Sequence, residues 1–162
     1  MPIRLYNEIE IFCTPEKLFN YVTQPWCWHE WHPDSRGARP HKQIPEGQAL
    51  NGQTLGVGDT FDESIEVKPF NLLPFVVKRY PRYVVRESAP HASWAAEGEF
   101  SDGWLAFRYE IEPMGCSVLF KRTMQFKVRG VMRLLVPIVR RKQERKSLVA
   151  LAALKRKLEA DA

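Results

Sequence analysis

The sequence predicts an α+β protein in which a strongly curved antiparallel sheet wraps around a long C-terminal helix. Three observations carry this prediction. Apolar and polar residues alternate in several segments after residue 60, turn-forming residues separate these segments, and leucines recur at spacings of three and four near the C-terminus. The chain has 162 residues, 44% hydrophobic and 27% charged, which is the size and apolar content of one globular domain over residues 1–162.

The N-terminal part of the chain predicts one strand and two short helices. Residues 3–11 alternate between apolar and polar side chains, as expected for a strand with one buried face. Thr14 followed by Pro15 is a helix start signal, and the predicted helix runs to about Thr23. The aromatic stretch 26–33 then predicts one or two further helical turns.

A long loop precedes a series of strands. Residues 34–58 contain five glycines and two prolines, which predicts a loop with at most one short strand. The strands that follow are separated by prolines and by Asp-Gly or Met-Gly pairs, which are turn signals of antiparallel hairpins. The predicted strands are 60–68, 73–80, 82–89, 92–100, 104–112 and 116–128.

Residues 130–162 predict a long amphipathic helix that covers the concave face of the sheet. Pro137 removes one backbone hydrogen bond, so we expect a kink or a break into two helices there. Because a helix of about 10 Å diameter cannot fill a strongly bent sheet, a mostly apolar cavity is expected between sheet and helix. The leucines of the predicted buried stripe are at positions 148, 151, 154 and 158.

Four stretches of the chain also resemble a known superfamily. They are TPEKLFNYVT from residue 14, WHEWHPD from residue 28, GDTFDE from residue 58, and the closing stretch 148–159. Together they resemble the START-like, helix-grip (Bet v 1-like) superfamily, or SRPBCC, and within it the polyketide cyclase/dehydrase and lipid-transport group. The resemblance covers nearly the whole chain. It implies a lipid, quinone or polyketide-like ligand held under the C-terminal helix, whereas fold alone does not fix the chemistry.

Strand alternation predicts which side chains face the cavity, and most of them are apolar. The polar exceptions are Asn7, Glu63, Tyr109 and Arg122. A charged group on an apolar face is costly unless it is paired, so Glu63 and Arg122 are the expected partners. Two roles follow for this pair: a structural salt bridge, or recognition of the polar head of a ligand.

We interpret the chain as a non-enzymatic carrier or sensor that binds or transports a small hydrophobic molecule in this cavity. The alternative is a cyclase or dehydratase in which a buried Glu, Tyr and Arg set works, with Glu63 or Tyr109 as general acid or base. No catalytic triad supports the alternative. The candidate cavity residues are Asn7, Phe61, Glu63, Ile65, Trp94, Phe100, Phe107, Tyr109, Phe120, Arg122, Met124, Leu134 and Ile138.

The sequence predicts neither a metal site nor a cofactor. His29 and His32 are three residues apart, but no third ligand lies at a useful spacing except His41. The glycines within residues 52–58 do not open a helix after a strand, which argues against a phosphate-binding loop or a dinucleotide site. None of the serines has the Gly-x-Ser-x-Gly setting of a nucleophile elbow.

Positive charge is concentrated near the C-terminus. The chain carries a net charge of +5, and residues 129–157 contain ten Lys or Arg and one acidic residue. A solvated helix face is one interpretation of this segment, and transient contact with an anionic membrane is another. Nucleic acid is not favoured, because no nucleic-acid-reading module accompanies the cations.

Residues 131–139 are apolar on more than one face, and we predict that they form a gate of the pocket.

The sequence also predicts a cytoplasmic location. The longest apolar run, 131–139, is interrupted by Arg133 and Pro137 and is shorter than the ~20 residues of a membrane span. The N-terminal residues contain no apolar stretch of signal-peptide length. Three cysteines at scattered spacing do not form a disulfide framework, and we expect them to be reduced.

Overall fold

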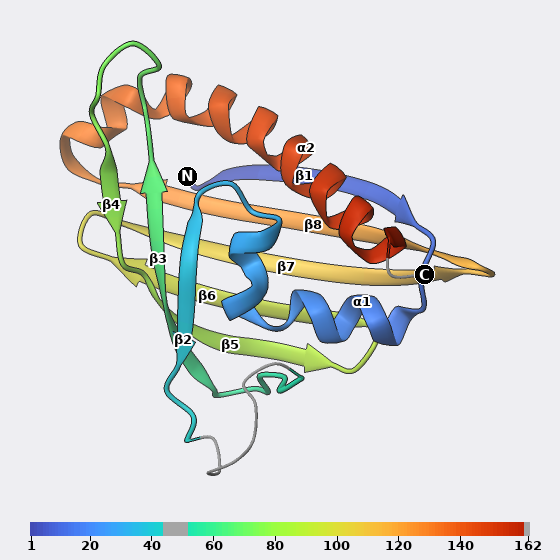
Figure 1. Cartoon of the computed structure of the whole chain (residues 1–162). Coiled ribbons are helices and arrows are strands. Elements are labelled where there is room, and N and C mark those ends of the chain that lie inside the picture. The colour runs from blue at the N-terminus through green and yellow to red at the C-terminus, as the bar shows by residue number, and fades with distance from the viewer. Residues whose placement is uncertain (44–51, 161–162) are drawn as a thin grey trace.

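The computed structural model of the chain describes residues 1–43 and 52–160 (Figure 1). A curled antiparallel sheet grips a long helix, α2, which lies across its concave side, and two short helices lie beside the lower part of that side. The helices are α1 (Pro15–Val22), the 3₁₀ helices η1 (Pro25–Glu30) and η2 (Gly130–Leu135), and α2 (Val136–Ala160). The strands are β1 (Ile3–Ile11), β2 (Ser35–Pro40), β3 (Thr60–Val67), β4 (Val77–Arg79), β5 (Arg82–Ala89), β6 (Ser93–Phe100), β7 (Gly103–Met114) and β8 (Ser117–Val128).

The predicted α+β architecture is confirmed, and the strand order explains its curvature. The order is β1-β8-β7-β6-β5-β3-β2, so the N-terminal strand pairs with the last one and β2 forms the opposite edge. The predicted short strand in the 34–58 loop is β2. Among the described residues β1 and β2 do not pair with each other, so the sheet is an open half-barrel whose gap is bridged by α2.

The predicted strand 73–80 is the one that differs most from the structure. Only Val77–Arg79 is a strand, because Pro74 lies within the predicted range and proline cannot donate to a sheet ladder. Both β4 and β5 pair with β3, and the register is continuous across the interruption. Pro81 sits at the interruption, where its carbonyl oxygen accepts a hydrogen bond of 3.1 Å from the Glu63 backbone N–H. One long partner of β3 is thus divided by proline.

Helix α1 begins and ends within one residue of its predicted bounds, whereas η1 ends at Glu30, three residues before the end of the predicted stretch 26–33. The Thr14 hydroxyl accepts a hydrogen bond of 3.2 Å from the Lys17 backbone N–H, and Pro15 occupies the first turn. Helix α1 buries three apolar side chains, and η1 follows at once from Pro25. This placement brings the indole of Trp28 into the concave side of the sheet.

Trp28 fills one half of the concave face. Its ring makes edge-on contacts with five aromatic rings at centroid distances of 5.4–6.3 Å. Its indole N–H donates to the Val22 carbonyl oxygen at 2.9 Å, so the polar atom of the ring is satisfied. The five rings come from β3, β5, β6 and β7, and they are Phe61, Tyr83, Trp94, Phe107 and Tyr109.

The fully buried residues of the C-terminal helix all lie from its middle onward. A break into two helices is observed: η2 ends at Leu135 and α2 begins at Val136. Pro137 lies in the first turn of α2, where the N–H that proline lacks would have no partner within the helix. The predicted leucine stripe needs one correction: Leu148 is exposed, and Ser147 takes its place on the buried face. No residue of η2 is buried. The buried residues of α2 are Ser147, Ala150, Leu151, Leu154 and Leu158.

Gly98 on β6 allows a close approach of the Tyr83 ring, and this contact gives a test of the fold. A Cβ atom at Gly98 would lie 2.7 and 2.9 Å from two carbons of Tyr83 and 3.0 Å from the Arg82 carbonyl oxygen. We expect Gly98→Ala to lower the free energy of unfolding by about 1–3 kcal/mol, measured by urea denaturation. Gly56→Ala is the control, because its nearest contact would be at 3.9 Å. Equal stability of the two variants would contradict the packing described here.

Candidate ligand-binding site

The other half of the concave face contains a cavity of about 120 Å³. It lies between the sheet on one side and η2 with the first turns of α2 on the other. Strand alternation directs side chains from β3, β7 and β8 into it, and two helical residues, Met132 and Val139, close it. Its apolar lining consists of Ile65, Val67, Pro69, Val77, Phe100, Leu105, Phe107, Met124, Phe126, Val128, Met132 and Val139.

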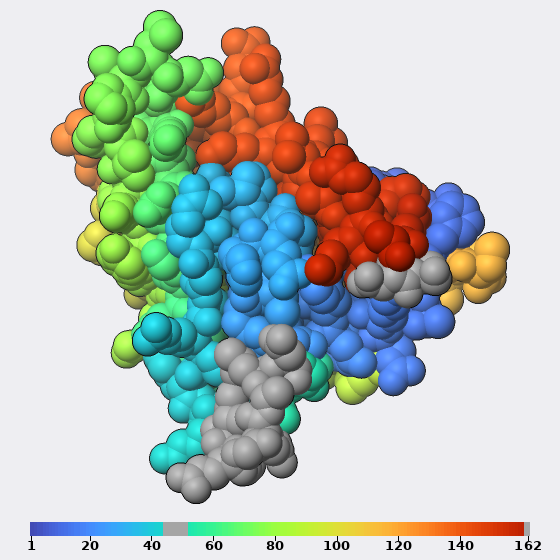
Figure 2. All heavy atoms as spheres, in the orientation of Figure 1, coloured from blue at the N-terminus to red at the C-terminus, as the bar shows by residue number. Residues whose placement is uncertain are grey.

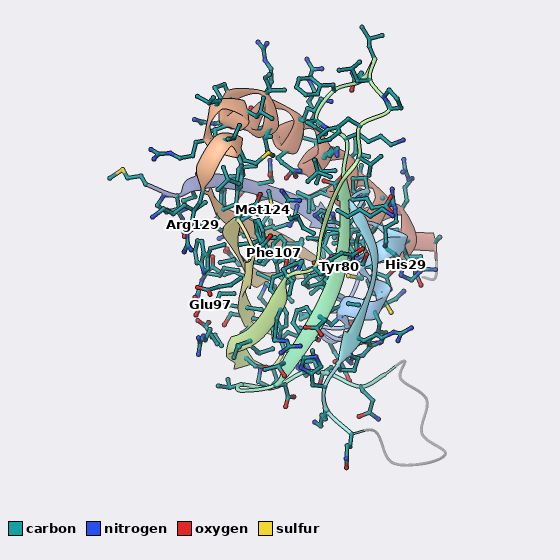
Figure 3. The ribbon with its side chains drawn as sticks, turned by 90° about the vertical axis from the view of Figure 1, so that its left-hand side faces the viewer. His29, Tyr80, Glu97, Phe107, Met124 and Arg129 are labelled. Carbon is teal, nitrogen blue, oxygen red and sulfur yellow. The ribbon has the colours of Figure 1, made fainter. Side chains whose placement is uncertain are left out.

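Five of the thirteen candidate residues line this cavity. Phe107 and Met124 are register partners on β7 and β8, and Figure 3 shows them in the interior beneath the helix. Glu63 and Ile65 come from β3, and Phe100 comes from the end of β6. The alternation of the strands indicated all five.

Six other candidates lie on the concave side but not in the cavity. For Phe61, Trp94 and Tyr109 the reason is Trp28, whose indole packs against their rings in that part of the concavity. Asn7 is half-buried opposite Arg122 in the β1–β8 register and is also outside the lining. The six candidates are Asn7, Phe61, Trp94, Tyr109, Phe120 and Arg122.

The two helical candidates, Leu134 and Ile138, point away from the cavity and are exposed. In a 3₁₀ helix a residue two positions further along faces another side, so Met132 and Leu134 cannot both face the sheet. Met132, Val139 and Gln143 line the cavity instead. These three residues are spaced by seven and four positions, which is the spacing of residues on one face of a helix. That spacing is the signal by which the sequence could have indicated them.

A buried guanidinium lies outside the cavity lining but in contact with the lining residue His32. The guanidinium of Arg122, on β8, is buried, and its Nη2 lies 2.7 Å from Nε2 of His32. Its Nη1 donates to the Ser147 hydroxyl of α2 at 3.4 Å. Its Cζ lies 5.3 Å from the centre of the Phe107 ring, which adds a cation–π contact.

The contact with Arg122 fixes the protonation of His32. An arginine can only donate, so Nε2 of His32 must accept, and the proton of the neutral ring is on Nδ1. Burial lowers the pKa of His32 well below its ordinary value, and the charges of Arg122 and Lys146 lower it further. His32 lines the cavity, and its Nδ1 has no hydrogen-bond partner among the described residues. The site therefore holds an unused donor.

Glu63, which also lines the cavity, supplies an unused carboxyl oxygen. Burial raises the pKa of Glu63 to about 7, while the nearby hydroxyls of Ser35 and Tyr83 and the charge of Arg122 act in the opposite direction. In the part of the chain that the structure describes, Oε2 of Glu63 has no hydrogen-bond partner, and neither hydroxyl reaches hydrogen-bond geometry.

The expected Glu63–Arg122 pair is not in contact. No ion pair joins these two residues in the described ranges, although both are buried. The strand order gives the reason, because β7, β6 and β5 separate β8 from β3. Strand alternation predicted the face that each side chain occupies and carried no information on this lateral distance.

Asp34 anchors the cap of the cavity. Its buried carboxylate forms an ion pair with Lys146 of α2 and accepts a hydrogen bond of 2.9 Å from the Gln143 amide. These contacts attach the middle of α2 to the turn between η1 and β2. Sequence reasoning missed Asp34, which lies directly after the His32-Pro33 pair at the start of β2.

The histidines considered as metal ligands lie apart. The His29 ring contacts the Trp26 carbonyl oxygen, His32 faces Arg122, and His41 contacts Thr60 and Asp62. Within residues 1–43 and 52–160 no three His, Cys, Asp or Glu side chains are grouped so that they could hold a metal ion.

Glu63 makes stability depend on pH in a defined direction. Its folded-state pKa of about 7 exceeds the ordinary value of 4.5, so the folded protein keeps a proton that the unfolded chain releases. The free energy of unfolding therefore falls as pH rises from about 4.5 to 7, by about 3 kcal/mol in total. We expect Glu63→Gln to be more stable than the parent above pH 7 and to match it near pH 4.5, measured by urea denaturation across pH. The exposed Glu99→Gln is the control, and a pH-independent effect of Glu63→Gln would contradict the assignment.

Solved structures resemble this one over its whole length. A START superfamily protein from Mycobacterium smegmatis superposes with a TM-score of 0.70 at 13% identity, covering 98% of this chain and 99% of that chain. The Zhui aromatase/cyclase from Streptomyces sp. R1128 has a TM-score of 0.70 at 8% identity, covering 98% and 94%. The di-domain aromatase/cyclase StfQ of the steffimycin biosynthetic pathway has a TM-score of 0.68 at 10% identity, covering 99% of this chain and 51% of that one.

These likenesses show the fold. The chain has the START-like helix-grip fold, as its motifs predicted. No protein-family model and no curated protein sequence matches it. A cavity between the sheet and the C-terminal helix is present in this chain.

Proposed function

We propose that this protein binds or transports a small hydrophobic molecule that carries one polar group. The observation that carries the proposal is a cavity with an almost wholly apolar wall, lined also by His32 and Glu63, each of which has a buried side-chain atom (Nδ1 and Oε2) without a hydrogen-bond partner among the described residues. The fold shared with the START superfamily protein supports it at a coarser level.

Burial of apolar ligand surface supplies the affinity. Each Å² removed from water contributes about 25 cal/mol, so a ring system that covers the aliphatic side chains of β3 and β8 gains several kcal/mol. The polar end supplies orientation. A ligand carbonyl would accept from His32, or a ligand hydroxyl would donate to Glu63, and either contact relieves the cost of leaving that atom unpaired in the interior.

A second candidate function is a cyclase or dehydratase activity. Glu63 favours it, because a carboxyl group whose pKa burial raises to about 7 exchanges protons readily near neutral pH. Two of the solved structures with this fold are aromatase/cyclases. The partner groups expected from the sequence, Tyr109 and Arg122, lie outside the cavity lining, so Glu63 would have to act with neutral His32.

The location in the cytoplasm stays a prediction from the sequence. Among the helices of residues 1–43 and 52–160, none is both long enough and apolar enough to cross a membrane.

Filling the cavity tests the proposal. Val67 lines the cavity, so we expect Val67→Trp to weaken binding of the neutral apolar fluorophore N-phenyl-1-naphthylamine about tenfold or more, measured by fluorescence titration. Val84→Trp is the matched control, because Val84 is a half-buried strand valine outside the cavity. Equal binding by both variants and the parent would show that the probe binds elsewhere.

Native mass spectrometry separates binding from catalysis. Protein purified from its own host should carry a small lipophilic molecule, and Val67→Trp should not. If the bound molecule keeps its mass on incubation with the protein, the binding function is supported. A change of mass that Glu63→Gln abolishes would instead identify an enzyme.

A further inference from the structure

Six large apolar side chains are exposed at one end of the molecule. Three belong to the β3–β4 loop, residues 68–76, and three to η2 and the start of α2. Leu72 is 97% exposed, Val131 80% and Leu134 79%, so these side chains gain nothing from the fold. We call the six residues the apolar tip: Leu72, Leu73, Phe75, Val131, Leu134 and Ile138.

The two halves of the apolar tip lie side by side. The Lys142 ammonium donates to the Lys68 carbonyl oxygen at 2.9 Å and to the Asn71 side-chain oxygen at 2.7 Å, which ties α2 to the loop. Figures 1 and 3 show the loop and the start of α2 rising at the same end of the molecule. In Figure 2 both project from the body of the protein. The exposed residues therefore form one surface rather than scattered positions.

The two segments that carry the apolar tip are rich in basic residues. Residues 68–80 contain three Lys or Arg, residues 127–143 contain six, and neither segment contains Asp or Glu. Within the described ranges Arg129, Arg133 and Arg141 form no ion pair, and all three are exposed. Three of the nine cations pair with acidic residues outside these two segments: Lys78 with Glu66, Arg79 with Asp102 and Arg140 with Glu144. Exposed apolar side chains beside unpaired, exposed arginines combine the two features that bind proteins to anionic bilayers.

The same two segments contribute to the cavity. Pro69 and Val77 line it from the β3–β4 side, and Met132 and Val139 line it from the helical side. A bilayer that holds the apolar tip would therefore lie next to the walls of the cavity. A ligand dissolved in that bilayer would reach the cavity by separating the β3–β4 loop from η2 and the start of α2.

We infer that the apolar tip docks on the surface of a bilayer that contains anionic lipid. Its six side chains enter the acyl boundary while the arginines meet the head groups. A second copy of the chain does not fit this surface, because it would bring the unpaired Arg129, Arg133 and Arg141 of one copy against those of the other. Nucleic acid would leave the apolar centre uncovered. If the protein binds a hydrophobic ligand as proposed above, the membrane would be the source of that ligand. Docking of the apolar tip itself does not depend on the proposed binding function.

Vesicle flotation tests the inference without any ligand. The purified protein should float with vesicles of phosphatidylcholine and phosphatidylglycerol at low salt, and much less with phosphatidylcholine alone or at high salt. Leu72→Ser combined with Leu134→Ser should weaken binding to the anionic vesicles about tenfold or more. The matched control is Leu148→Ser combined with Val149→Ser, two exposed residues of α2 outside the apolar tip.

Charge reversal tests the contribution of the arginines to membrane binding. Arg133→Glu combined with Arg141→Glu should remove the preference for anionic vesicles, whereas Arg156→Glu, exposed near the C-terminus, should keep it. Absence of flotation, equal flotation with neutral lipid, or equal losses in test and control variants would each overturn the inference. Self-association that Leu72→Ser with Leu134→Ser abolishes would overturn it in favour of a dimer.

The two proposals can fail separately. The leucine variants are outside the cavity lining, so they should still bind N-phenyl-1-naphthylamine with parental affinity. Val67→Trp should still float with anionic vesicles. Loss of both activities in one variant would indicate unfolding, which circular dichroism detects.

Discussion

The insertion of Trp28 into the concave side of the sheet determines which half of that side is filled and which half contains the cavity. A single helix cannot cover a half-barrel of this curvature, and the indole fills the part that α2 leaves open. Its edge-on contacts with rings from four strands fix their relative positions. The filled half therefore acts as a rigid wall, and the remaining half stays open as the cavity.

The sequence was sufficient for the elements and for the facing of most strand residues. Alternation placed Glu63, Phe107 and Met124 on the concave side, and the Thr14-Pro15 signal located α1. Two features of the site could not be predicted from the sequence. Which half of the concavity is filled depends on Trp28, which is far from those strands in the chain, and the separation of Glu63 from Arg122 depends on strand order.

Attachment of the C-terminal helix is unequal along its length. At its far end, the Lys17 ammonium donates to the Leu158 carbonyl oxygen and the Phe12 backbone N–H donates to Glu159. In the middle, Asp34 holds Lys146. Beyond that point, towards η2, no side chain is buried, and the contacts that Lys142 makes with the β3–β4 loop are on the surface. The gate over residues 131–139 stays a prediction.

The open edge of the half-barrel would let the cavity change size with few lost contacts. At about 120 Å³ the cavity is smaller than the roughly 300–1,000 Å³ of common ligand pockets. Because the described parts of β1 and β2 do not pair, α2 bridges a gap rather than a closed barrel. A shift of η2 and the first turns of α2 would enlarge the space without breaking one backbone hydrogen bond of the sheet. Ligands of different lengths would then share one polar end and differ only in how far they displace the helix.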